Sequence, residues 1–128
     1  MHATAQMDRL PYRETLSPYR LRMLIDFIEA NLDAPLPLES LASTAALSRA
    51  HLARAFRAAT GLSPHRYVLQ RRLEKAHALL RRSASPLREI AARCGFSDAA
   101  HLSKAYKRNF GTLPSSKYRS FSAHTSSG

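Results

Sequence analysis

Apolar residues recur at helical spacing along most of this chain, and no stretch alternates apolar and polar residues long enough to predict a strand. A first set at i, i+3, i+4 and i+7 predicts a helix that buries one face: Leu21, Leu24, Ile25 and Ile28. The residues expected to end this helix are Asp33, Pro35 and Pro37. The pattern therefore predicts an all-α fold of about seven helices.

Shorter apolar sets predict two pairs of short helices on either side of a long one. The first pair is expected over roughly 38–45 and 48–60, the long helix over 64–82, and the second pair between Leu87 and Gly111. A final short helix is expected around Pro114 and Tyr118. A serine stands at four of the expected starts and is predicted to cap the helix there: Ser17, Ser48, Ser63 and Ser85.

These elements predict a chain with a flexible lead-in, two similar subdomains, a linker helix between them and a short tail. The expected boundaries are 1–17 for the lead-in, 18–63 for the first subdomain, 64–82 for the linker helix, 83–121 for the second subdomain and 122–128 for the tail.

Two segments about fifty residues apart have nearly the same sequence, namely ALSRAHLARAFRAATG (46–61) and GFSDAAHLSKAYKRNFG (95–111). The residues before them also align, 38–42 with 87–91. Each copy consists of a short helix, a tight turn and a second helix. This is the helix-turn-helix pattern, in which the second helix enters the major groove of DNA.

The two turns contain small residues at matching positions, Ala46 and Gly95. Glycine suits a left-handed backbone conformation, whereas alanine pays about 1 kcal/mol to adopt it. We therefore expect the first turn to differ from the second in detail.

The predicted second helix of each copy presents a polar face opposite its buried residues. In the first copy the residues directed away from Leu52 and Phe56 are Arg49, Ala50, Ala53, Arg54 and Arg57. In the second copy the residues directed away from Leu102 and Tyr106 are Asp98, Ala99, Ala100, Ser103, Lys104 and Lys107. A single face of this kind is usually only solvated, but two matched basic copies favour a DNA-binding role.

The charge distribution points the same way. The net charge is +11, and residues 1–37 contribute −1 while residues 38–128 contribute +12. The excess therefore lies in the part of the chain that contains the duplication. A basic domain of this kind is expected to bind a polyanion, most often nucleic acid and less often an acidic membrane surface.

Other function classes find little support in the residues. The single Cys94 excludes an internal disulfide and a multi-cysteine zinc site, and the six histidines are scattered without a metal-binding or catalytic motif. We therefore expect no enzyme activity, no cofactor and no metal. The chain has no run of about 18 apolar residues and no apolar signal segment, so we expect a cytoplasmic protein without a membrane partner.

The linker helix has a suitable length for two DNA-reading units. Residues 64–82 at about 1.5 Å each form a rod of roughly 28 Å. Successive major-groove segments on one face of DNA lie about 34 Å apart. One chain could thus place two recognition helices one helical turn apart.

Several motifs resemble the DNA-binding domain of the AraC/XylS family of bacterial transcription regulators. The resemblance covers about 18–119 and rests on TGLSPHRY, RRLEKAHALL and the run IAARCGFSD. It implies two helix-turn-helix units that bind asymmetric sites in double-stranded promoter DNA, and a contact with RNA polymerase if the protein is an activator. Many family members place an effector-binding domain before this one, and we expect none in this chain.

The resemblance also assigns roles to residues. Together with the helix faces above, it predicts base-facing positions at Arg49, Ala50, Ala53, Arg54, Asp98, Ala99, Ala100, Ser103 and Lys104. The positions predicted to contact the DNA backbone are Ser48, His51, Arg57, Ser97, His101, Lys107 and Arg108.

Two features depart from the family pattern. Alanine occupies four of the base-facing positions, so contacts with thymine methyl groups and DNA shape are expected to carry more of the discrimination. The family spaces its last proline and tyrosine as P-x-x-Y, whereas Pro114 and Tyr118 are one residue further apart. A general basic nucleic-acid-binding protein without sequence preference is the alternative hypothesis.

Overall fold

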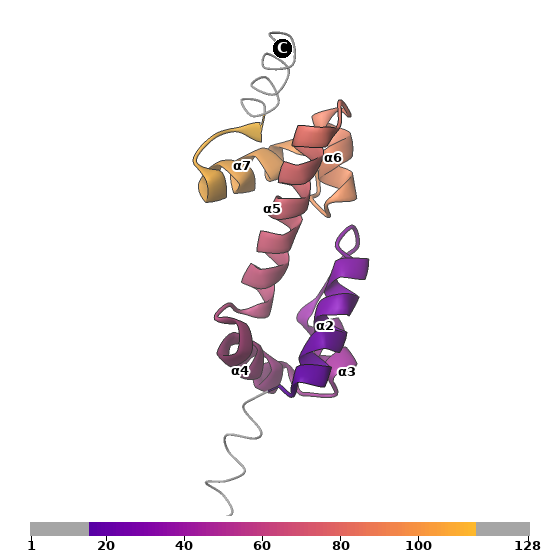
Figure 1. Ribbon diagram of the computed structural model, residues 1–128, viewed down its shortest axis with the longest axis vertical. Coiled ribbons are helices and arrows are strands. Elements are labelled where there is room, and N and C mark those ends of the chain that lie inside the picture. The colour runs from indigo at the N-terminus through magenta and orange to yellow at the C-terminus, as the bar shows by residue number, and fades with distance from the viewer. Residues whose placement is uncertain (1–15, 115–128) are drawn as a thin grey trace, which may run out of the picture. The chain divides into compact units, whose positions relative to one another are not determined.

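The computed structural model describes residues 16–114, and over this range it contains six helices and no strand. In chain order the helices are α2 (Pro18–Ala30), α3 (Leu38–Ala45), α4 (Arg49–Thr60), α5 (Pro64–Arg82), α6 (Leu87–Arg93) and α7 (Ala99–Phe110) (Figure 1). The predicted all-α class is confirmed. The expected last helix around Pro114 and Tyr118 extends outside the described residues.

Three of the four predicted serine caps are present. The side-chain oxygens of Ser17, Ser48 and Ser63 each accept a hydrogen bond from the backbone N–H three residues later. The prediction for Ser85 is wrong, because α6 begins at Leu87 with Pro86 at its N-cap and no side-chain cap. The N–H of Ser85 instead donates to the hydroxyl of Ser83 at 3.0 Å.

The first helix ends earlier than the prolines suggest. Its C-cap is Asn31, whose side-chain amide donates to the carbonyl of Phe27 at 2.8 Å and whose backbone N–H donates to the carbonyl of Ile28 at 3.0 Å. Asparagine satisfies two carbonyls that would otherwise lack partners at the helix end. Asp33, Pro35 and Pro37 therefore follow the helix rather than end it.

The chain divides into two compact units, each with its own core. Over the described residues, the first unit comprises 16–31 and 35–69, and the second comprises 32–34 and 70–114. In the first unit α2 packs on α3 and α3 packs on α4. In the second unit α6 packs on α7. Helix α5 begins in the first unit and continues through the second.

Most of the fully buried side chains stand at the helical spacing seen in the sequence, although Leu21 and Ile25 of the first predicted set are only half-buried. In the first unit the largest fully buried side chains are Leu24, Ile28, Leu41, Leu52 and Phe56. In the second unit they are Leu80, Ile90, Cys94, Leu102, Tyr106 and Pro114. Burial of this apolar surface is the main favourable contribution to folding.

The connection between α2 and α3 is held within the second unit by the side chain of Arg72 in α5. The Nε of Arg72 donates to the carbonyl of Leu32 at 3.0 Å, and its Nη2 donates to the carbonyl of Ala34 at 2.7 Å. Gly95 packs against the same segment, since a Cβ at this position would lie 2.2 Å from the Leu32 carbonyl oxygen. Arg72 thus satisfies two backbone carbonyls that lie outside any helix.

Candidate nucleic-acid interface

The two helix-turn-helix turns have the same backbone conformation. Ala46 has φ 58° and ψ 42°, and Gly95 has φ 83°, so both residues are left-handed. The next residue closes each turn in the same way. The N–H of Leu47 donates to the carbonyl of Ala42, and the N–H of Phe96 donates to the carbonyl of Ala91, both at 2.9 Å. Alanine thus adopts the same left-handed conformation as glycine, and the turns differ in detail at the preceding residue, since α3 ends at Ala45 whereas α6 ends at Arg93 with Cys94 as its C-cap.

Helix α4 is the predicted recognition helix of the first pair. It buries Leu52, Ala55 and Phe56, and the ring of Phe56 packs edge-on against Tyr67 with centroids 5.2 Å apart. The predicted base-facing residues lie on the other side, where Arg49, Ala50 and Arg54 are exposed and Ala53 is half-buried. Of the predicted backbone contacts in this pair, Ser48 and Arg57 are exposed and His51 is half-buried.

Helix α7 is the predicted recognition helix of the second pair. It buries Leu102 and Tyr106, as the sequence predicts. The predicted DNA-facing residues that are exposed are Ser97, Asp98, Ala100, His101, Lys104, Lys107 and Arg108, while Ala99 and Ser103 are half-buried. Both predicted recognition helices therefore expose most of their predicted polar positions, while His51 and Ser103 are only half-buried.

Asp98 is the N-cap of α7, so the helix begins at Ala99. Its carboxylate Oδ1 accepts a hydrogen bond from the N–H of His101 at 2.7 Å. The corresponding cap of α4 is the neutral hydroxyl of Ser48. The N-terminal end of α7 therefore has a negative charge that α4 lacks at its own cap.

The two matching histidines have different surroundings. The Nδ1 of His101 accepts a hydrogen bond from the N–H of Ser97 at 3.3 Å, which places the proton of the neutral ring on Nε2. The Nε2 of His51 is instead buried and, among the described residues, has no hydrogen-bond partner. His101 is thus an exposed residue with an Nε2–H donor, whereas the Nε2 of His51 is buried in the protein.

The structure contains an ion pair that the sequence analysis did not identify. The guanidinium of Arg49, the first residue of α4, contacts the carboxylate of Glu39 in α3 at 3.2 Å. The two residues are ten positions apart, so neither helical spacing nor composition indicates the pair. Their contact depends on how α3 and α4 cross.

The single cysteine is buried. Cys94 has no exposed surface, and burial raises the pKa of its thiol, against the smaller opposing effects of Lys75, Arg93 and Arg72. No group of three His, Cys, Asp or Glu residues in the described part of the chain is arranged to hold a metal ion.

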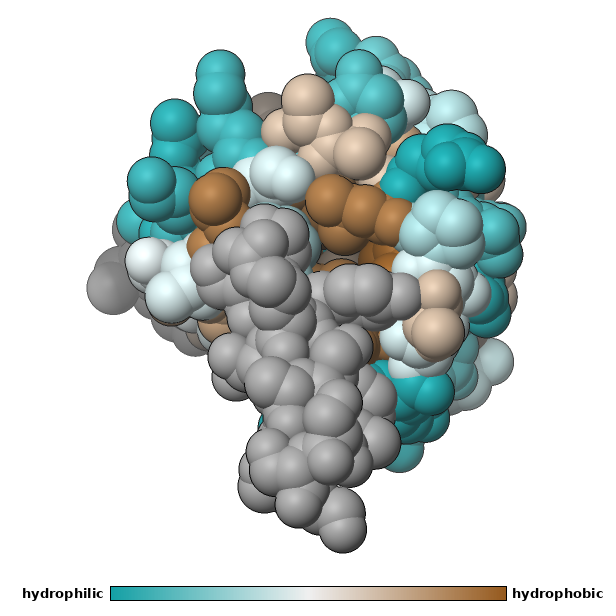
Figure 2. Space-filling model, turned by 90° about the horizontal axis from the view of Figure 1, so that it is seen from above, coloured by the Kyte–Doolittle hydropathy of each residue, from teal (hydrophilic) through white to brown (hydrophobic). Residues whose placement is uncertain are grey.

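Few large apolar side chains reach the surface. In the described residues they are Tyr19, Met23, Leu62, Phe110 and Leu113, and none is a predicted DNA-facing position. The face drawn in Figure 2 is hydrophilic over most of its edge, with apolar atoms exposed nearer its middle. No helix among residues 16–114 is long and apolar enough to cross a membrane.

Comparisons with known proteins agree with this arrangement. A family model described as a helix-turn-helix domain matches residues 41–120. The chain is 36% identical over 109 residues to the HTH-type transcriptional regulator GbdR of Pseudomonas aeruginosa, covering 84% of this chain and 30% of that protein. It is 38% identical over 98 residues to the HTH-type transcriptional activator RhaS of Escherichia coli, covering 77% of this chain and 35% of that protein.

Solved structures show the same fold. The DNA-binding domain of AdpA, a global transcriptional factor crystallised with a target DNA, is 28% identical with a TM-score of 0.78, covering 88% of this chain and 100% of that one. An AraC-type transcriptional regulator from Chromobacterium violaceum is 31% identical with a TM-score of 0.72, covering 78% of this chain and 89% of that one.

These matches define the class of protein as a DNA-binding domain of transcription regulators. The chain belongs to the AraC-type helix-turn-helix family, which confirms the resemblance seen in its motifs. It spans only 30% of GbdR and 35% of RhaS.

Proposed function

We propose that the chain binds double-stranded promoter DNA in a sequence-specific manner and regulates transcription without catalysing a reaction. In this proposal α4 and α7 enter successive major-groove segments of one asymmetric site. The observation that supports it best is the matched pair of turns, each followed by a capped helix of 12 residues with an apolar side buried and a polar side exposed.

The proposed base contacts come from a small set of long side chains. Arg54 in α4 and Lys104 in α7 are exposed cations on the polar sides of their helices. Arginine and lysine bind the O6 and N7 acceptors of guanine in the major groove. The alanines beside them, Ala50 and Ala100, are exposed and suit contacts with thymine methyl groups. We therefore expect Arg54 and Lys104 to bind guanines, and Ala50 and Ala100 to contact thymine methyl groups.

The proposed backbone contacts combine cations with neutral donors. Arg57, Lys107 and Arg108 are exposed in the last turns of their helices and are suited to bind phosphates. His101 adds an Nε2–H donor, since its Nδ1 already accepts from Ser97. These contacts orient the domain on DNA but carry no sequence information.

The length of α5 supports binding across two groove segments. Its 19 residues correspond to about 28 Å at about 1.5 Å per residue, which is close to the helical repeat of about 34 Å. A regulator of this kind acts in the bacterial cytoplasm, and as an activator it would also contact RNA polymerase.

A selection from random-sequence duplexes tests the proposal. The selected duplex and a scrambled control are then titrated by fluorescence anisotropy at two salt concentrations. We expect two short blocks about one helical turn apart and binding at least about a thousandfold tighter than to the control. A single block would mean that only one helix reads bases.

The alternative is a basic protein without sequence preference, which the net charge of +11 would also favour. It predicts that no duplex outcompetes the control, while affinity still falls steeply with salt. That result would contradict the proposed function and leave only the electrostatic part of it.

A further inference from the structure

The ion pair between Glu39 and Arg49 joins the two helices of the first helix-turn-helix pair. The Oε2 of Glu39 lies 3.2 Å from the Nη1 of Arg49, and their side chains are 66% and 65% exposed. Arg49 is the first residue of the recognition helix α4, next to the cap Ser48. The pair therefore lies at the N-terminal end of α4, the helix that is proposed to enter the major groove.

The second pair of helices lacks this contact. Arg88 stands at the position that matches Glu39, and Ala99 follows the cap Asp98 as Arg49 follows Ser48. The ion pair is thus specific to the first copy and does not follow from the helix-turn-helix fold.

The exposure of the pair argues against a role in stability. Ion pairs that are so accessible to water contribute little to folding, because solvent and salt screen them. A carboxylate next to a DNA-facing arginine instead competes with DNA phosphates for the guanidinium. It also restricts the rotamers of a side chain that would otherwise be free to bind any nearby phosphate.

We propose that Glu39 is a positioning residue that determines specificity by holding Arg49 away from the phosphates of non-cognate DNA. The inference rests on the proposed function, in which α4 enters the major groove. On random DNA, Glu39 competes with the phosphates for the guanidinium, so Arg49 releases less counterion there than it would without the carboxylate. At the preferred site, the guanidinium contacts DNA in the orientation that the carboxylate sets.

The test is the salt dependence of binding to a pool of random-sequence duplexes about two helical turns long. Each phosphate contact adds about 0.9 to the slope of log affinity against log salt. In Glu39→Gln, Arg49 is released, so the slope on random DNA should steepen by about one. This corresponds to about a threefold larger loss of affinity between 50 and 200 mM salt.

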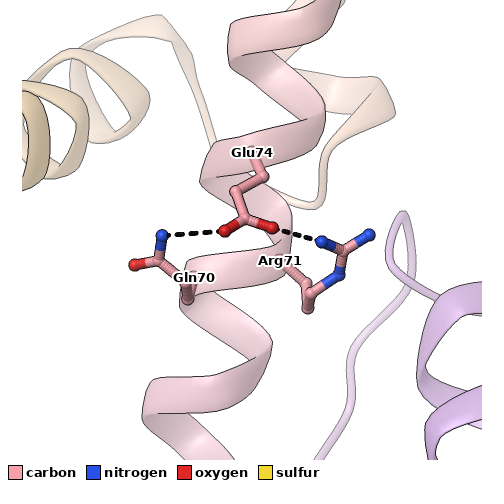
Figure 3. A network of polar contacts seen from close by, with 3 residues as sticks. All are labelled: Gln70, Arg71 and Glu74. Atoms are coloured by element: carbon pink, nitrogen blue, oxygen red, sulfur yellow. Dashed lines mark hydrogen bonds and ion pairs between the residues drawn. The ribbon is translucent and has the colours of Figure 1, made fainter.

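A second acidic residue provides the matched control. Glu74 in α5 is 44% exposed and is paired with Arg71 and Gln70 (Figure 3). Glu74→Gln therefore removes the same charge and an equivalent ion pair from a helix that is not proposed to enter the groove. We expect its slope on random DNA to match the wild type. An equal steepening in both variants would overturn the inference, because net charge alone would explain it.

The double variant Glu39→Gln/Arg49→Ala decides whether Arg49 carries the effect. With Arg49 absent, removing Glu39 should leave the slope of the Arg49→Ala variant unchanged. A steeper slope in the double variant would mean that Glu39 repels DNA directly, which contradicts a positioning role. Circular dichroism and thermal unfolding verify that each variant is folded.

The preference for the selected duplex separates this inference from the proposed function. If the wild type prefers no duplex, the proposed function fails, and Glu39 cannot determine specificity. If the wild type has a preference but Glu39→Gln keeps both that preference and the wild-type slope, only the inference fails. We expect the preference of Glu39→Gln to fall, and to fall about threefold further at 50 mM than at 200 mM salt, because random DNA gains a contact that the preferred site already has.

Discussion

Ala46 is the one non-glycine residue with a positive φ in the described part of the chain. Its counterpart Gly95 cannot be replaced without cost, because a Cβ there would also meet the carbonyl of Leu32. Ala46 has only the backbone strain, since its side chain is exposed. Glycine at position 46 should therefore relieve the backbone strain of the first turn, because glycine already occupies the matching position 95 of the second turn.

Replacing Ala46 with glycine should stabilise the protein. Left-handed alanine costs about 1–2 kcal/mol, and the greater backbone entropy of unfolded glycine returns about 0.5–1 kcal/mol of this. We expect Ala46→Gly to raise the free energy of unfolding by about 0.5–1 kcal/mol. Denaturant titration of the variant and the wild type measures this change in the free energy of unfolding. As a control, Ala58→Gly on the exposed side of α4 should destabilise by about 1 kcal/mol, and equal effects of the two would contradict the strain.

The buried thiol of Cys94 predicts a loss of stability in alkali. Burial raises its pKa in the folded state, so its contribution is fully present below the unfolded value of about 8.5 and is lost as the pH rises through the folded pKa. We expect Cys94→Ala to reduce the fall of unfolding free energy between pH 7 and pH 10. Parallel curves for the variant and the wild type would contradict this, because they would show that the thiol titrates alike in the folded and unfolded states.

At the scale of the element, the start of α6 shows that a helix can begin without a side-chain cap. Pro86 has φ −60° and ψ 151°, and Pro37 before α3 has φ −67° and ψ 153°. Both prolines serve as N-caps through their extended backbone alone. At α2 and α5 the proline instead follows a capping serine and is the first helical residue.

Serine substitutions can measure this difference. Ser48→Ala removes a side-chain acceptor from the N-terminus of α4 and should cost about 1 kcal/mol of unfolding free energy. Ser85→Ala removes no cap and should cost less than about 0.5 kcal/mol. Thermal unfolding of the two variants under the same conditions compares their losses of unfolding free energy. A loss at Ser85 as large as at Ser48 would mean that its hydroxyl supports α6 after all.

The same elements show how far the sequence determines the fold and the site. Helical periodicity and serine caps predict the helices correctly where side chain and backbone act within a few residues, as at Ser17 and Ser63. The start of α6 was also predictable, because the duplication aligns Pro86 with Pro37. The pair of Glu39 and Arg49 was not, since it depends on the crossing of two helices rather than on sequence spacing.

At the scale of the whole molecule, the charge excess and the duplication coincide in residues 38–128, which have a net charge of +12. Charge alone attracts any duplex, whereas the matched helices are proposed to select one. The two effects belong to different residues, since base-facing side chains read sequence and backbone-facing side chains only bind phosphate. Substitutions on the two recognition helices should therefore have different signatures.

Arg54→Ala and Lys107→Ala test this separation. Arg54 has a predicted base-facing position, so its loss should cost about 1–3 kcal/mol on the selected duplex and much less on random DNA. Lys107 has a predicted phosphate-facing position, so its loss should weaken all duplexes alike and reduce the salt slope by about one. Arg88→Ala on the exposed surface of α6 controls for the loss of one charge. If Arg54→Ala weakens selected and random duplexes equally, Arg54 binds phosphate, and the discrimination of the first helix must come from its alanines and from DNA shape.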